Sequence, residues 1–261
     1  MSTYNRVVAA DETASLAPTV LTQLATDLSD TFAPLTSSRN LLINSNFAVN
    51  QSAYVSATDL ALNAYGLDMW KATTATSRMT FTAAPQGQTV TIAAGDSFGQ
   101  VVERANVTAG SHILSWPGTA EARVYNVGGS APSYAASPIT VTLDGLADVL
   151  AEFGPGTVGQ VQLERGTVAT PYQPPMYADN LAKCQRYYET GSAKVFVNDA
   201  TGVALATNFK VTKRAAPTMA YSTASDRTYL PGSTEWVDEQ GFSVYRAARE
   251  VGFVWSANAR L

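Results

Sequence analysis

Three acidic residues surround a tryptophan near the end of the chain. Glu235, Asp238 and Glu239 flank Trp236 within residues 222–240, a polar stretch rich in turn-forming residues. Hydrolysis of a glycosidic bond needs two carboxylates held across a groove, and clustered carboxylates can also hold a hard cation. A solvated loop has the same composition, and acids scattered along a sequence do not establish a pair. We therefore expect a solvated loop here, with a catalytic or cation site as the alternative.

The residue types that nucleophilic or metal chemistry needs are scarce. His112 is the single histidine and Cys184 the single cysteine, so one chain cannot assemble a histidine-based triad, a multi-histidine metal site or an internal disulfide. No glycine-rich phosphate loop and no Cys/His ligand spacing is present. We expect a structural histidine, unless symmetry brings three copies of it together, and a packed, inert thiol. The sequence thus predicts no enzyme, no cofactor and no metal.

Aromatic and polar side chains in loops suit the binding of a sugar. Aromatic rings cover the C–H faces of a sugar ring, and polar side chains bond to its hydroxyl groups. Trp70, Tyr125 and Tyr245 are aromatic candidates of this kind. Burial in a subunit interface is the alternative explanation for such residues. The predicted ligand-binding residues are Tyr229, Trp236, Asp226, Arg227, Glu235, Tyr54 and Tyr65.

The composition describes a globular protein with a largely uncharged surface. The chain has 261 residues, of which 46% are hydrophobic and 15% charged, and its net charge is −4. This length allows one to two domains with a short extension. Nucleic-acid binding needs clustered Lys and Arg, whereas the local group of Lys210, Lys213 and Arg214 fits a solvated strand end. We therefore expect no nucleic-acid partner.

Membrane and export signals are absent from the sequence. No apolar run approaches the roughly 18 residues that a membrane-spanning helix needs. The first residues, M-S-T-Y-N-R, contain no apolar signal-peptide core. We expect no membrane insertion, and a protein that is made in a cytoplasm and stays there until it is released.

The N-terminal part predicts a polar arm followed by a helix. Residues 1–11 are polar, whereas residues 11–35 carry an apolar stripe at helical spacing. A single helix this short is marginal in water and needs a partner. It packs either on its own chain or in a coiled-coil stub between identical chains, which we favour because the polar linker 36–39 separates it from the β-rich part of the chain. The predicted oligomerisation residues are Leu21, Leu24, Leu28, Phe32 and Leu35.

Residues 40–163 show the alternation and turn spacing of an antiparallel β-sandwich, such as a jelly roll. A buried apolar strand and a polar turn are expected within residues 40–47. Helical periodicity is almost absent, apart from a helical turn at residues 147–153. Further strands are predicted at residues 79–81, 89–92, 98–102, 112–116, 122–125, 139–143 and 159–163.

Residues 161–188 join two β-rich regions. Residues 161–164 alternate as a half-buried strand does, and a break rich in Pro and Thr then interrupts regular structure. Residues 180–189 begin a new unit, either as a short helix or as the start of a strand. Strands are then predicted at residues 194–197, 203–211, 218–221, 242–245 and 252–255. The predicted fold class is mostly β, with an arm and short helix in residues 1–39, a jelly roll in 40–175 and a second, smaller β-sandwich-like domain in 176–261.

Three stretches of the chain stand out as sequence modules. They are N-L-L-I-N-S-N-F-A-V-N-Q at 40–51 with G-L-D-M-W at 66–70, V-Q-L-E-R-G-T-V-A-T-P-Y-Q-P-P at 161–175, and L-A-K-C-Q-R-Y-Y at 181–188. Together they resemble tailed-bacteriophage fibre and spike proteins, and F-K-V-T-K-R-A-A-P-T-M at 209–219 is similar to a strand and turn of that family's distal domain. The resemblance extends over residues 40–261. It implies a carbohydrate-binding-like jelly roll in which Trp70 is a core residue.

The resemblance also implies a role as a virion structural protein, here a short fibre that is a homotrimer. Residues 1–35 would attach it to a phage tail or capsid protein, and the helical stripe would form the trimer. The outer domains would bind a host cell-surface polysaccharide or protein. The protein would be assembled in the cytoplasm of the host bacterium and then belong to the virion. A head fibre or decoration protein without a receptor role, and a spike that depolymerises a glycan, are the alternatives.

Overall fold

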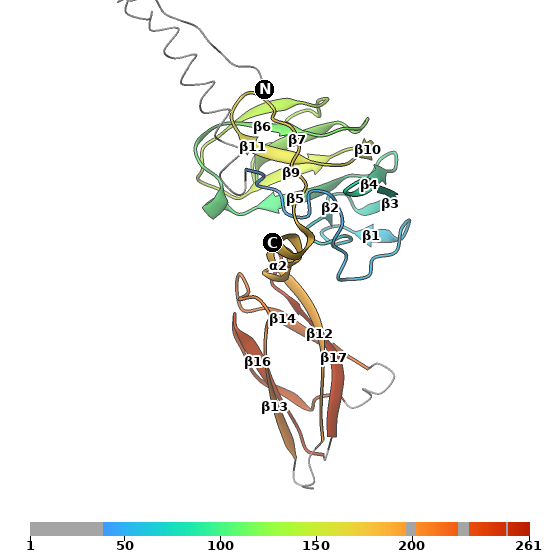
Figure 1. The fold of residues 1–261 in the computed structure, drawn as a ribbon, viewed down its shortest axis with the longest axis vertical. Coiled ribbons are helices and arrows are strands. Elements are labelled where there is room, and N and C mark those ends of the chain that lie inside the picture. The colour runs from blue at the N-terminus through green and yellow to red at the C-terminus, as the bar shows by residue number, and fades with distance from the viewer. Residues whose placement is uncertain (1–38, 197–201, 224–229, 249) are drawn as a thin grey trace, which may run out of the picture. The chain divides into compact units, whose positions relative to one another are not determined.

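The fold is built almost entirely from antiparallel β-strands (Figure 1). The structure, a computed structural model, describes residues 39–196, 202–223, 230–248 and 250–261. The mostly β fold class predicted from the sequence is confirmed. The predicted arm and the helical stripe of Leu21, Leu24, Leu28, Phe32 and Leu35 lie outside the described residues, so the trimer stays a prediction.

Three sheets occupy the chain between residues 59 and 165 (Figure 1). The first has the strand order β1 (Asp59–Ala61), β3 (Thr76–Ala84), β4 (Gly87–Ile92) and β10 (Gly156–Val158). The second has the order β2 (Lys71–Ala72), β5 (Phe98–Val102), β9 (Val149–Phe153) and β7 (Ala122–Asn126). The third has the order β11 (Gln162–Arg165), β6 (Gly110–Ser115) and β8 (Ile139–Leu143). Strands β5 and β8 begin and end at the predicted residues.

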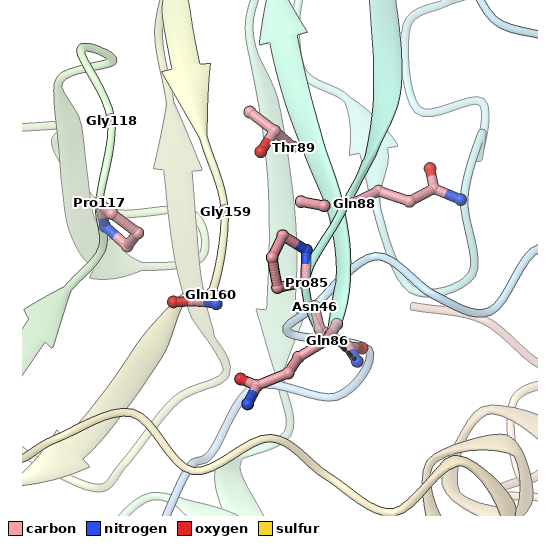
Figure 2. A pocket seen from close by; sticks show the side chains of 10 residues that line it. Asn46, Pro85, Gln86, Gln88, Thr89, Pro117, Gly118, Gly159 and Gln160 are labelled. Atoms are coloured by element: carbon pink, nitrogen blue, oxygen red, sulfur yellow. Dashed lines mark hydrogen bonds between the residues drawn. The ribbon is translucent and has the colours of Figure 1, made fainter.

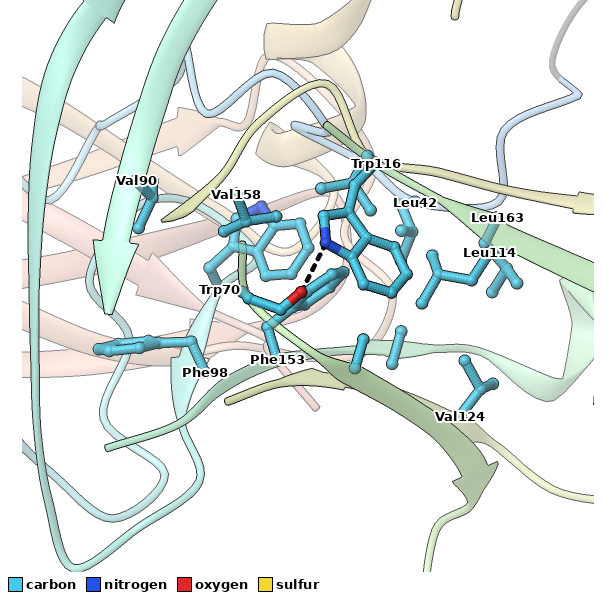
Figure 3. Close-up of a cluster of buried hydrophobic side chains, with 14 of the residues drawn as sticks. Leu42, Trp70, Val90, Phe98, Leu114, Trp116, Val124, Phe153, Val158 and Leu163 are labelled. Carbon is cyan, nitrogen blue, oxygen red and sulfur yellow. Dashed lines mark hydrogen bonds between the residues drawn. The ribbon is translucent and has the colours of Figure 1, made fainter. Parts of the chain in front are cut away.

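Aromatic side chains fill the core that these sheets share (Figure 3). Trp70, Trp116 and Phe153 are at most 5% exposed, and the Phe153 ring meets Trp116 edge to face at 5.2 Å. Each indole N–H has a partner, because Trp70 donates to the carbonyl of Asn44 at 3.0 Å and Trp116 to that of Ala120 at 2.9 Å. The core therefore buries large rings without leaving their polar atoms unpaired. The prediction that Trp70 is a core residue is confirmed.

Residues 149–153 form strand β9, so the helical turn predicted at residues 147–153 is wrong. Strand β9 lies inside its sheet and pairs with β5 on one side and β7 on the other. Val149, Ala151 and Phe153 are at most 1% exposed and belong to the shared core, so every second side chain of the strand faces that core. The intervening Leu150 and Glu152 face the other side of the sheet, and the sequence V-L-A-E-F reads as helical only because Leu, Ala and Glu favour helices.

Residues 40–47 contain the predicted turn but not the predicted strand, since bends and turns occupy residues 43–47. Asn44 and Phe47 have φ values of 53° and 56°, which lie outside the β region. The Asn44 side chain forms hydrogen bonds that strand pairing would otherwise supply to the backbone. Its Nδ2 donates to the carbonyls of Val49 and Asp68, both at 2.9 Å. The apolar residues of the segment still pack on the core, which explains why its composition resembles that of a strand.

The joint after the third sheet contains helix α2 (Tyr177–Gln185), followed by strand β12 (Tyr188–Phe196). Residues 180–189 were predicted to form either a short helix or the start of a strand. The segment does both, because it completes helix α2 and then begins strand β12. Cys184 is fully buried in one cluster with Val49, Met69 and Tyr187. Burial raises the pKa of its thiol. The prediction that Cys184 is a packed residue is confirmed.

Two smaller sheets come after the joint. One has the order β12, β17 (Glu250–Asn258) and β14 (Thr218–Ser222), and the other β13 (Val203–Asn208), β16 (Gly241–Arg246) and β15 (Ser233–Val237). Both sheets contribute to one core, as in a small β-sandwich. The core residues are Val203, Phe209, Phe242, Val244, Val251, Phe253, Trp255 and Ala257. We call this region the distal sandwich and the region of the first three sheets the first sandwich; the predicted domain boundaries stay predictions.

Candidate functional site

Trp236 and Glu235 lie on β15, an edge strand that the sequence did not predict. Residues 222–240 read as a polar loop because four of the five strand residues are exposed, so the alternation that marks a strand is missing. Strand β15 nonetheless pairs with β16, with a bulge between Thr234 and Trp236. Backbone pairing, rather than burial, therefore positions the tryptophan. The expected solvated loop is in part an edge strand.

One face of this sheet presents two aromatic rings above small side chains. The neighbouring residues on β16 are fully buried, so Ser243 and Tyr245 point away from the core. Ser243 on β16 pairs with Trp236 on β15 and with Ala206 on β13. Tyr245 on β16 pairs with Ala204 on β13. We call Trp236, Tyr245, Ser243, Ala204 and Ala206 the aromatic face.

The two rings of the aromatic face are open to solvent and held by the sheet. Trp236 is 44% exposed and Tyr245 is 37% exposed. Diagonal positions on paired strands are about 7–8 Å apart, so the two rings occupy neighbouring positions on this face. A Cβ on Gly202 would overlap the ring of Tyr245, so glycine allows this ring to lie beside the start of β13. A surface fixed in this way is already arranged for a ligand.

The acidic residues beside Trp236 have local roles. Glu235 accepts a hydrogen bond from the hydroxyl of Ser233. Asp238 Oδ1 accepts the N–H groups of Gln240 and Gly241 at 2.7 and 3.0 Å, which closes the turn between β15 and β16. Within the described residues, no group of three or more His, Cys, Asp or Glu side chains is placed to hold a metal ion. Asp238 is thus a turn-closing residue.

Tyr54 and Tyr65, both predicted to bind a ligand, are covered by the protein itself. Tyr54 is 9% exposed and donates its hydroxyl to the carbonyl of Thr58 at 2.6 Å. Tyr65 donates to the carbonyl of Leu261, and the guanidinium of Arg260 lies 4.6 Å from its ring centre. Burial raises the pKa of Tyr65 to about 12. Both hydroxyls are thus bonded within the chain, and contact of these rings with a ligand stays a prediction.

The remaining candidates lie apart from the aromatic face. Tyr125 on β7 donates its hydroxyl to Glu152 at 2.9 Å, and burial together with this carboxylate raises the pKa of Tyr125 to about 12. His112 is 1% exposed, with Nδ1 3.1 Å from the carbonyl oxygen of Gly110, as expected of a structural histidine. The predicted ligand-binding residues Asp226, Arg227 and Tyr229 lie outside the described residues.

Sequence reasoning missed Ser243, Ala204 and Ala206. The pattern G-F-S-V-Y-R at 241–246 alternates apolar and polar residues, and this signal alone would have placed Ser243 on the same side as Tyr245. The alanines carry no such signal, because their part in the face depends on which strands pair.

Comparison with known proteins leaves the family of this chain open. No family model and no curated protein matches it. Two solved structures of discoidin II from Dictyostelium discoideum do match. The native recombinant protein has 9% identity and a TM-score of 0.20 over 84% of this chain and 92% of that chain. The wild-type protein has 8% identity and a TM-score of 0.21 over 86% and 92%. TM-scores this low establish neither a shared fold nor a shared function.

None of the helices in the described ranges is long and apolar enough to cross a membrane.

Proposed function

We propose that this chain is a non-enzymatic binding protein whose aromatic face holds a sugar residue of a host cell-surface glycan. The observation that carries the proposal is the pair of exposed rings, Trp236 and Tyr245, on neighbouring strands of one sheet face. An exposed ring gains free energy when the C–H groups of a sugar displace water from it, in proportion to the apolar area covered.

Polar groups next to the rings suit the hydroxyl groups of the same sugar. Ser243 lies on β16, the strand that carries Tyr245, and pairs with Trp236 on β15; its hydroxyl both donates and accepts hydrogen bonds. Glu235 is exposed beside Trp236 and accepts hydrogen bonds. Ala204 and Ala206 are exposed and short, so a flat ring can approach the sheet over β13, beside Tyr245.

The proposed setting is a short, homotrimeric fibre of a tailed bacteriophage. The motifs at residues 40–51, 161–175 and 181–188 support it through their resemblance to fibre and spike proteins. In this proposal, residues 1–35 attach the fibre to a tail or capsid protein, and assembly takes place in the cytoplasm of the host bacterium. A head fibre without a receptor role would share these motifs, so glycan binding is the property that separates the two.

The proposal is tested with full-length protein on an immobilised panel of bacterial surface polysaccharides. We expect Trp236→Ala and Tyr245→Ala each to weaken binding to the recognised polysaccharide by about tenfold or more, since aromatic anchors carry much of the energy of such surfaces. Phe196→Ala is the matched control, because Phe196 is an exposed aromatic residue on another strand, 65% exposed. Binding that is equally strong in all three variants would contradict the proposal.

The mass of each variant in solution separates ligand binding from subunit contact. A glycan-binding face predicts that Trp236→Ala leaves the oligomeric state unchanged. If this variant instead dissociates while glycan binding per chain is retained, the aromatic face is a subunit interface and the proposed site is wrong. Release of reducing ends from the polysaccharide by wild-type protein would show that the chain is an enzyme.

A further inference from the structure

A pocket of about 350 Å³ lies in the first sandwich (Figure 2). It is far from the aromatic face in sequence and shares no residue with it. Figure 2 shows Thr89 and Pro85 facing Gly159 across the pocket, with Gln86 and Gln160 at one end of it. The lining residues that matter for ligand binding are Asn46, Gln86, Thr89, Pro117, Gly159 and Gln160. We call this the amide pocket.

The amide pocket offers free, uncharged hydrogen-bonding groups. Within the described residues, the polar side-chain atoms of Gln86, Thr89 and Gln160 have no hydrogen-bond partner in the protein. A primary amide and a hydroxyl each supply both donors and acceptors. The described lining contains no Asp, Glu, Lys or Arg. Pro85 and Pro117 supply apolar walls beside these groups.

Two glutamines of the amide pocket adopt a backbone conformation that favours glycine. Gln86 has a φ of 66° and Gln160 a φ of 47°. Gln86 follows Pro85 in the two-residue connection between β3 and β4, where a type II turn normally places Gly or Asn. Glycine would adopt this φ with less strain than glutamine does. The feature that glutamine adds at this position is its side-chain amide. Strain of this kind concentrates at binding sites.

The wall that carries Gln86 is fixed by hydrogen bonds. Asn46 Nδ2 donates to the carbonyl of Gln86 at 2.8 Å, and the N–H of Gln88 donates to the carbonyl of Asn46 at 2.9 Å. Asn46 is itself held by Asn180 of α2, whose Nδ2 donates to Asn46 Oδ1 at 3.2 Å. A Cβ on Gly87 would overlap the Asn46 carbonyl, so the turn is pressed closely against this asparagine. The pocket is therefore already formed before a ligand arrives.

We propose that the amide pocket binds one uncharged sugar residue, at a site separate from the aromatic face. Sugar hydroxyls pair with groups that both donate and accept, and the C–H edges of a sugar match the proline walls. A charged ligand would lose hydration without gaining a counter-ion in this lining. The volume falls within the range of roughly 300–1,000 Å³ that is usual for small-molecule sites. Binding in this pocket does not depend on the function proposed for the distal sandwich.

The test titrates full-length protein with neutral monosaccharides, observed by ligand-detected NMR and calorimetry. Glucose, galactose, mannose and N-acetylglucosamine are the probes, with glucuronate and a short uncharged peptide as comparisons. We expect at least one neutral sugar to bind with a dissociation constant of about 1 mM or lower. No binding by any neutral sugar, or tighter binding of glucuronate or of the peptide, overturns the proposal.

Glycine substitutions separate a ligand site from a merely structural turn. Gln86→Gly and Gln160→Gly remove an amide and relieve the backbone, so each is expected to raise Tm by about 2–4 °C while weakening sugar binding by about tenfold. Asn63→Gly is the matched control, because Asn63 is exposed with a φ of 64° outside the pocket. It should raise Tm and leave binding unchanged. Higher Tm with unchanged binding in the glutamine variants overturns the proposal.

Two further variants test whether the sugar binds in the amide pocket without changing the Gln86 turn. One is in the amide pocket and the other is in the aromatic face. Thr89→Val removes a hydroxyl from β4 while keeping a β-branched side chain, and it should weaken sugar binding without unfolding the strand. Trp236→Ala should leave binding in the amide pocket unchanged. If monosaccharide binding disappears in Trp236→Ala and survives in Gln160→Gly, the ligand occupies the aromatic face and the amide pocket is not its site.

Discussion

The first sandwich and the distal sandwich contain different kinds of buried polar groups. Behind the amide pocket, Asn44, Asn46 and Asn180 form a neutral network, in which the N–H of Asn44 donates to Asn180 Oδ1 at 2.9 Å. In the distal sandwich, Lys213 and Glu189 are fully buried, with Nζ 2.5 Å from Oε2. A broken amide network leaves an unpaired dipole, whereas a broken ion pair leaves an uncompensated charge. The two regions should therefore respond to mutation very differently.

The largest effect is expected at the buried ion pair. Lys213 uses all three ammonium donors, since it also donates to the carbonyls of Gln185 and Val211 at 2.7 and 2.9 Å. Burial lowers the pKa of Lys213, although Glu189 opposes this. Lys213→Met would leave the carboxylate of Glu189 buried without a cation, so it should lower the free energy of unfolding by about 3–5 kcal/mol, measured by urea denaturation.

A double variant shows how much of the lost free energy of unfolding comes from the buried, unpaired charge of Glu189. Adding Glu189→Gln to Lys213→Met removes the charge, so most of the lost stability should return. Lys210→Met is the control, because this lysine is exposed and only its backbone N–H contacts Glu189. It should change stability by no more than about 0.5 kcal/mol. A double variant as unstable as Lys213→Met would mean that packing, not charge, explains the loss.

A smaller effect is expected in the neutral network of the first sandwich. Asn180→Ala removes the acceptor of the Asn44 N–H and the donor to Asn46, both buried, and should cost about 2 kcal/mol. Because Asn46 also holds the Gln86 turn, the same variant should weaken sugar binding in the amide pocket. Asp179→Ala, at an exposed position of the same helix, is expected to cost no more than about 0.5 kcal/mol. Equal losses in both variants would contradict a special role for the network.

The sequence predicted elements whose side chains alternate, and it failed where pairing or polar side chains decide the structure. Residues 98–102 and 139–143 were placed correctly because apolar strands and turn residues mark them clearly. Strand β15 was missed since it is held by backbone pairing to β16 and buries little. The strand predicted within residues 40–47 does not form, because the bonds of this segment come from the side chain of Asn44.

Candidate site residues were harder to predict, because exposure depends on tertiary packing. Trp236 was placed correctly on the surface from its polar neighbours, whereas Tyr54 has equally polar neighbours and is buried. The amide pocket gave no sequence signal at all. Its glutamines come from the β3–β4 turn and the segment after β10, and only the fold brings them together.

The smallest effect is expected at Glu152, one of the buried carboxylates of the first sandwich. Burial alone would raise the pKa of its carboxyl, but hydrogen bonds from Arg123, Thr73 and Tyr125 outweigh burial and hold the pKa below its usual range. Ionised Glu152 therefore stabilises the fold above the unfolded-state pKa of about 4.3, and this contribution is lost as the pH falls through the lower folded-state value.

Glu152→Gln should cost about 1–2 kcal/mol at neutral pH, and the difference from wild type should shrink below about pH 4. Thermal unfolding between pH 7 and pH 3 measures it, with the exposed Glu121→Gln as control. A difference that stays constant over this range would show that Glu152 stabilises the first sandwich through packing and not through its charge.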